Sequence, residues 1–143
     1  MSMSTAPKFV PRATPETQRY WDGAAAGELW IQRCTPEQHA FFYPRTSCPT
    51  CGTEELEWLQ ASGRATLYSY VISHRPAPGF TPPYFIAVVE LEEGPRMMTN
   101  LVGVEPTREG VDLDMPLVVD FEQRGDEMSV PVFRPASTQE EGR

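Results

Sequence analysis

The sequence predicts a mainly β protein with an N-terminal helix, a small cysteine-bearing module and a closed Greek-key barrel of five short strands. Three observations lead to this fold class. All three cysteines lie between residues 34 and 51, at the spacing of a zinc ribbon. Fifteen prolines and ten glycines divide the 143-residue chain into short segments, which favours strands and loops over a helix bundle. After residue 60, short β-branched and aromatic runs alternate with turns and show no helical period.

The first region, residues 1–27, is predicted to hold an arm and one helix. Residues 1–12 lack periodicity and are expected to form a loose arm. Thr14, followed by a proline and an acidic residue, has the pattern of a helix start, and Gly27 is a stop signal. We therefore predict a helix over residues 15–26, whose narrow apolar stripe suits packing within the chain or docking of its aromatic pair on another protein. The stripe consists of Tyr20, Trp21, Ala24 and Ala25.

The remaining chain is expected to form a ribbon-like module at residues 28–61 and a barrel at residues 62–135. The module opens with an alternating strand at residues 28–33. Closing five short strands into a barrel removes the sheet edges that they would otherwise expose. The expected barrel strands are residues 64–74, 84–91, 96–104, 117–121 and 128–133. The polar tail at residues 136–143 is predicted to be disordered.

The cysteine loop predicts a structural zinc site. Cys48 and Cys51 form an intact knuckle of two thiols two residues apart. The first knuckle begins at Cys34, but the position of its second ligand holds Glu37. A carboxylate is a permitted zinc ligand, and His39, two residues further on, is an alternative. We therefore expect three thiolates completed by one of these two side chains.

Two other interpretations of the cysteine loop remain open. The module can be metal-free and held by aromatic packing. The aromatic residues available for this packing are Trp30, Phe41, Phe42 and Tyr43. Alternatively, Cys48 and Cys51 are a redox pair, which requires a preceding strand and a following helix to lower the thiol pKa. A proline-rich loop precedes them and strands are predicted to follow, so the context disfavours redox exchange.

Charge and the lack of long apolar runs limit the possible partners. Twenty acidic and twelve basic residues give a net charge of -8, which disfavours generic nucleic-acid binding. Eleven of the twelve basic residues are arginine, so a local anion site would use guanidinium groups. No apolar run is long enough to cross a membrane and no export leader is recognised, so we expect a cytoplasmic protein.

Four basic side chains are candidates for ligand binding, and no set of residues suggests a catalytic centre. His74 and Arg75 follow the long strand and precede a loop, where barrels of this kind take ligands. Arg45 and Arg64 are weaker candidates of the same type. The alternative for all four is a solvated surface charge.

Five segments of the sequence resemble, in order and spacing, a family of zinc-ribbon plus OB-fold proteins associated with acyl-CoA metabolism and long labelled a domain of unknown function. The similarity runs from Tyr20 to Pro135 and departs from the family pattern at Glu37 and Gln38, where the family has Cys and Gly. The segments are YWDGAAAGELWIQRC, YPRTSCPTCG, SGRATLYSYVISHRP, PYFIAVVELEEGPRMMTNLVG and PVFRP.

This resemblance implies a rubredoxin-like zinc ribbon, a five-stranded OB-fold barrel and a role as an accessory subunit of an enzyme. Members of the family serve as accessory subunits of thiolase-fold thiolases and aldolases, and sometimes of hydratases. We therefore expect a non-catalytic subunit of a hetero-oligomer that assists the binding of an acyl-CoA thioester, in the degradation of a steroid or aromatic side chain. The residues expected to contact coenzyme A phosphates are Arg45, Arg64, His74 and Arg75. The alternatives are a nucleic-acid-binding module and an independent hydrolase or hydratase.

Overall fold

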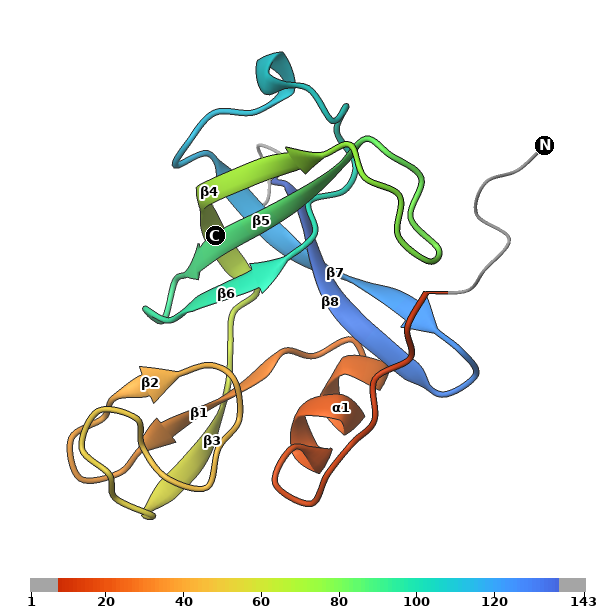
Figure 1. The fold of residues 1–143 in the computed structure, drawn as a ribbon. Helices are drawn as coiled ribbons and strands as arrows, with labels where there is room; N and C mark the ends of the chain where they lie inside the picture. The colour runs from red at the N-terminus through yellow and green to blue at the C-terminus, as the bar shows by residue number, and fades with distance from the viewer. Residues whose placement is uncertain (1–7, 137–143) are drawn as a thin grey trace.

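The computed structural model describes residues 8–136 and confirms a mainly β protein with one N-terminal helix (Figure 1). Residues 1–7 of the expected arm and residues 137–143 of the expected disordered tail lie outside the described residues. The elements are α1 (Gln18–Ala25), β1 (Trp30–Cys34), β2 (Ala40–Phe41), β3 (Leu56–Gln60), β4 (Arg64–Ser73), β5 (Tyr84–Leu91), β6 (Arg96–Thr99), a 3-10 turn η1 (Arg108–Gly110), β7 (Pro116–Arg124) and β8 (Met128–Pro135).

Helix α1 begins later than predicted and packs inside the molecule. The amide of Thr17 donates to the carbonyl of Thr14 (2.9 Å), so a turn occupies the first predicted residues and the helix starts at Gln18. Gly27 ends it with a φ of 80°. Tyr20 and Trp21 are buried in the main hydrophobic core, as the packing interpretation expects. Within residues 8–136, no helix is sufficiently long and apolar to cross a bilayer.

The first sheet, which we call the ribbon (residues 30–60), has the strand order β2-β1-β3. Strand β1 lies close to the predicted residues 28–33 and pairs antiparallel with both neighbours. Strand β3 was not predicted, although its pairing with β1 runs over five residue pairs, from Trp30 with Gln60 to Cys34 with Leu56. The ribbon is therefore a small sheet whose central strand ends at the first cysteine.

The second sheet, which we call the barrel (residues 64–135), has the order β6-β5-β4-β7-β8 and confirms the five predicted strands. Strand β4 pairs with β5 along its length but with β7 only over Arg64–Thr66. A register shift between Leu67 and Ser69 lets β4 bend, and the sheet curls into a half-barrel (Figure 1). An isolated parallel bridge between Leu101 and Phe133 links the two ends of the sheet.

Strand β6 is shorter than the predicted 96–104 because the chain turns away after Thr99. The Asn100 side chain donates to the carbonyl of Phe85 (2.7 Å), and Leu101 then meets β8. The hairpin of β7 and β8 is longer than the predicted strands 117–121 and 128–133, since the two strands pair from Leu117–Pro135 to Arg124–Met128. The bounds of β4 and β5 agree with prediction to within one residue.

The described part of the arm is attached to the barrel, which differs from the expected loose arm. The ammonium group of Lys8 lies 2.9 Å from the Glu122 carboxylate and 4.3 Å from the centre of the Phe80 ring. Arg124 donates to the carbonyl of Phe9 (3.2 Å). These are contacts between residues more than seventy positions apart, so local periodicity could not reveal them.

Candidate functional site

Four side chains of the ribbon form a compact thiol–histidine group: Cys34, His39, Cys48 and Cys51. Their ligand atoms all lie within 4.8 Å of one another. Cys34 Sγ lies 3.5 Å from His39 Nδ1 and 3.9 Å from Cys51 Sγ, and Cys48 Sγ lies 3.8 Å from His39 Nδ1. A zinc tetrahedron with metal–sulfur bonds of about 2.3 Å has sulfur–sulfur edges of about 3.8 Å. The described ligand atoms therefore fit one tetrahedral zinc ion.

Two tight turns bring these ligands together. The first leaves β1 at Cys34 and returns at His39, whose carbonyl accepts a hydrogen bond from the Cys34 amide (3.0 Å). Gln38 has a φ of 61° in this turn, a left-handed conformation that costs a non-glycine residue about 1–2 kcal/mol. In the second turn the Gly52 amide donates to the carbonyl of Cys48 (2.8 Å). Both turns orient side chains toward one point at the end of the ribbon.

Backbone amides favour the thiolate form of Cys48. Burial raises the pKa of Cys48, but hydrogen bonds from the backbone of Cys51 and Thr50 outweigh it and lower the pKa to about 6. The backbone of Thr53 lowers the pKa of Cys51, but desolvation and the neighbouring thiols outweigh this effect and raise it. The lowered pKa of Cys48 favours its thiolate, which is the form that binds metal.

The structure distinguishes the two side chains expected as the fourth ligand. His39 Nδ1 faces the thiols, whereas the Glu37 carboxylate lies outside the group and is exposed. Glu37 Oε1 instead lies 3.9 Å from Nε2, the other nitrogen of the His39 ring.

The aromatic residues expected to hold a metal-free ribbon pack mostly outside the ribbon's own buried cluster. The ribbon's own buried cluster contains Cys34, Phe41 and Cys48, with Leu56 packed at its edge. Phe42 packs on the main core, and its ring and that of Tyr43 contact Tyr20 of α1. The ribbon therefore has one buried aromatic residue at its centre, which favours a metal-stabilised module.

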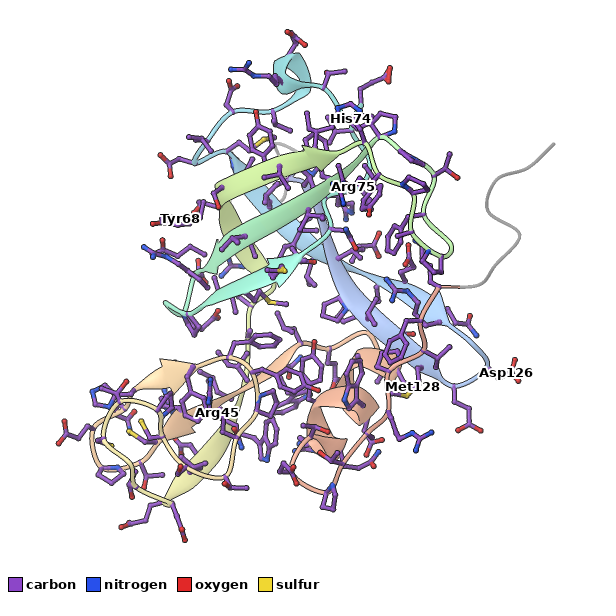
Figure 2. The ribbon with its side chains drawn as sticks, in the orientation of Figure 1. Arg45, Tyr68, His74, Arg75, Asp126 and Met128 are labelled. Carbon is purple, nitrogen blue, oxygen red and sulfur yellow. The ribbon has the colours of Figure 1, made fainter. Side chains whose placement is uncertain are left out.

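The basic residues predicted to bind coenzyme A are spread over the molecule, and Figure 2 labels three of them, Arg45, His74 and Arg75. His74 and Arg75 are exposed neighbours just after β4, at the end of the barrel far from the ribbon, whereas Arg45 lies on the ribbon. Arg64 lies at the opposite end of the ten-residue β4, which spans roughly 30 Å if straight. The structure thus brings together His74 and Arg75 only.

Arg64 is already engaged by an acidic partner. Its guanidinium donates two hydrogen bonds to the Glu92 carboxylate, at 2.7 and 3.0 Å. This hydrogen bonding lowers the pKa of Glu92. A cavity of about 320 Å³ lies beside this pair, between the ends of β4, β5 and β7. A phosphate at Arg64 would therefore compete with Glu92.

A second hollow, which sequence reasoning missed, lies where the ribbon and α1 meet the barrel. Its volume is about 280 Å³. Aromatic rings of Tyr20, Trp21, Phe42 and Tyr43 line one side, and Met98 of β6, 71% exposed, lies on the other. The aromatic pairs Tyr20–Trp21 and Phe42–Tyr43 are visible in the sequence, but only the fold places them together.

Comparison with known proteins assigns both parts of the chain to described domains. Residues 21–57 match the rubredoxin-like zinc ribbon domain of ChsH2, and residues 58–122 match the C-terminal OB-fold domain of ChsH2. A DUF35 domain-containing scaffold protein of Pyrococcus furiosus is 32% identical over 84% of this chain and 93% of its own length. This chain belongs to the DUF35 family.

Other relatives of this DUF35 protein are subunits of larger size. A probable enoyl-CoA hydratase alpha subunit of Thermomonospora curvata is 38% identical over 94% of this chain, which spans 47% of that subunit. The 3-oxo-4,17-pregnadiene-20-carboxyl-CoA hydratase alpha subunit of Mycobacterium tuberculosis is 39% identical over 78% of this chain, which spans 36% of it. This DUF35 protein therefore spans about half or less of these two curated relatives.

Solved structures confirm the fold of the DUF35 protein. A chain of the Ltp2-ChsH2(DUF35) aldolase superposes with a TM-score of 0.79 and 36% identity, covering 90% of this chain and all of that one. A DUF35 protein of Sulfolobus solfataricus with unknown function has a TM-score of 0.61 at 13% identity and supports the fold alone.

Proposed function

We propose that this DUF35 protein is a non-catalytic accessory subunit of a cytoplasmic hetero-oligomer. It docks on a thiolase-fold enzyme, an aldolase or a thiolase, and assists the binding of an acyl-CoA thioester in the degradation of a steroid or aromatic side chain. The observation that carries the proposal is the match to the whole of one chain in the Ltp2-ChsH2(DUF35) aldolase at 36% identity. The hydratase alpha subunits of the two bacterial relatives also support a partner role.

The distribution of reactive side chains supports an accessory role. The chain has two histidines. His39 faces the thiols of the ribbon, and His74 is exposed at the end of β4. A metal ion held by His39 and the cysteine thiols would occupy the imidazole nitrogen and the sulfur atoms that proton transfer or covalent catalysis would need. We therefore assign the reacting groups to the partner enzyme.

The exposed pair His74 and Arg75 is the strongest candidate for coenzyme A contacts on this chain. Both side chains are accessible and adjacent, and a guanidinium group can hold a phosphate by two hydrogen bonds. Arg45 is also accessible and is a second candidate, on the ribbon. Arg64 remains a candidate only if the phosphate displaces Glu92 from its two hydrogen bonds.

Reconstitution tests the docking role. The purified chain, a candidate partner enzyme and their mixture are assayed for co-elution and for cleavage of a CoA thioester. We expect no turnover by the chain alone, and restored activity or solubility of the partner in the mixture. Turnover by the isolated chain would contradict the proposal, as would a fully active partner that neither binds nor responds to it.

Charge reversal tests the coenzyme A contacts in the active mixture. Arg75→Glu should raise KM for the CoA substrate about tenfold or more while leaving kcat and co-elution unchanged, because a lost charge-assisted hydrogen bond costs about 1.5–3 kcal/mol. Arg12→Glu, at another exposed arginine of the described chain, is the matched control. An unchanged KM for Arg75→Glu would remove this residue from the site.

A further inference from the structure

We infer that the ribbon of this chain holds zinc through the thiolates of Cys34, Cys48 and Cys51 and through Nδ1 of His39, with Glu37 supporting the histidine ring and not binding the metal. The zinc-ribbon match and the thiol–histidine group motivate a structural zinc ion. The assignment of the fourth ligand is particular to this chain, and it does not depend on the docking role proposed above.

The distances from His39 Nδ1 to the cysteine sulfur atoms fit an imidazole nitrogen as the fourth zinc ligand. Zinc–nitrogen bonds of about 2.0–2.1 Å and zinc–sulfur bonds of about 2.3 Å give nitrogen–sulfur edges of about 3.6 Å in a tetrahedron. His39 Nδ1 lies 3.5 Å from Cys34 Sγ and 3.8 Å from Cys48 Sγ. Cys51 Sγ completes the set at 3.9 Å from Cys34 Sγ. The side chains can therefore bind one ion with little rearrangement.

The backbone explains why residue 39 reaches the site. Cys34 and His39 face each other across the turn, joined by the hydrogen bond from the Cys34 amide to the His39 carbonyl (3.0 Å). The Gln38 amide donates to the Cys34 carbonyl (2.9 Å), which tightens the same turn. The His39 amide also donates to Cys34 Sγ (3.3 Å). These bonds direct the His39 side chain inward, while Glu37 lies on the exposed side of the turn.

The position of Glu37 suits a supporting role. An imidazole that binds zinc through Nδ1 is neutral and carries its proton on Nε2, where a carboxylate commonly accepts it and fixes the ring. Glu37 Oε1 is the carboxylate oxygen 3.9 Å from His39 Nε2, and its side chain is 65% exposed, so a small rotation brings it within hydrogen-bond distance. Three thiolates and a neutral histidine give the zinc site a net charge of about -1, against about -2 for four thiolates.

X-ray absorption of the zinc-loaded full-length chain tests the assignment. We expect three sulfur scatterers and one nitrogen scatterer with the multiple-scattering signature of imidazole. His39→Ala should abolish that signature. Glu37→Gln should keep the signature and the sulfur count while weakening zinc affinity about 10-fold to 100-fold. Competition with a chromogenic zinc chelator measures that affinity.

An unchanged zinc affinity in Glu37→Gln would overturn the supporting role of Glu37, and one further variant tests the role of His39. If His39→Ala does not fold, His39→Cys replaces the nitrogen by a fourth sulfur, and we expect a folded chain with four sulfur scatterers. An imidazole signature that persists without His39 would overturn the proposal. Loss of an oxygen scatterer in Glu37→Gln, or a purified chain that takes up no zinc, would also overturn it.

Discussion

The barrel and the cysteine end of the ribbon differ in how much apolar interior they contain. The barrel, α1 and strands β1 and β3 of the ribbon share a core that includes large, fully buried side chains such as Phe85, Phe133 and Ile31. The centre of the ribbon contains one aromatic residue, Phe41, between Cys34 and Cys48. A small module with so little apolar interior needs another source of stability. The barrel therefore depends on burial, whereas we expect the cysteine end of the ribbon to depend on ligand bonds to a metal.

The largest effect is expected from truncating the barrel core. Phe133 is fully buried on β8 and also forms the bridge to Leu101. Phe133→Ala should reduce the free energy of unfolding by about 3–5 kcal/mol, because it removes the ring and leaves a cavity. Urea denaturation measures this change, and Phe9→Ala, at a side chain 77% exposed, is the control. A loss below about 1 kcal/mol would show that burial is not what holds the barrel.

A smaller effect is expected at the contact between α1 and the ribbon. A Cβ atom on Gly23 would clash with the Trp30 ring of β1. Gly23→Ala should therefore cost about 1–3 kcal/mol in unfolding free energy as the two elements shift. Combining it with Trp30→Ala removes the obstructing ring, so the double variant should lose less than the sum of the two single variants. Additive losses would contradict this steric explanation.

The smallest effect is expected where the arm meets the barrel, and it depends on pH. Burial raises the pKa of Glu122, but hydrogen bonds from Lys8 and Arg124 outweigh it and lower the pKa. Because the pKa of Glu122 is lower in the folded protein than in the unfolded protein, the ionised side chain stabilises the fold at pH values above the unfolded pKa. This stabilisation is lost as the pH falls through the folded pKa.

Glu122→Gln should therefore reduce unfolding free energy by no more than about 1 kcal/mol at pH 7, because the side chain is partly exposed. The difference from wild type should shrink on acidification toward pH 3. Thermal unfolding over this pH range provides the measurement. A difference that grows as the pH falls would have the wrong sign and refute the ion-pair account.

The barrel was predictable because its strands carry their own local signals. The runs at β4 and β5 are long, β-branched and bounded by turns, and their bounds agree with the structure. Strands β2 and β3 gave no comparable signal. Strand β2 has two residues, and Leu56–Gln60 is mixed in polarity and becomes a strand through pairing with β1. These two segments form strands because they pair with β1, and pairing between distant segments cannot be recognised in a single sequence.

The thiols of the thiol–histidine group were predictable from the sequence, but its fourth member was not. Spacing allowed both Glu37 and His39, since each lies within a few residues of Cys34. Only the hydrogen-bonded turn shows which side chain points inward. The partner of Arg64 was likewise hidden, because Glu92 is 28 positions away and approaches only when β4 and β5 pair.

The most direct test of the contrast between the two regions is hydrogen exchange on the full-length chain before and after zinc chelation. With zinc bound, amides of β1 and β3 in the ribbon and of β4, β5 and β8 in the barrel should all be protected. After chelation, we predict that the ribbon loses protection from about Cys34 to Leu56 while the barrel keeps it. Equal loss in both regions, or an unchanged ribbon, would contradict the account.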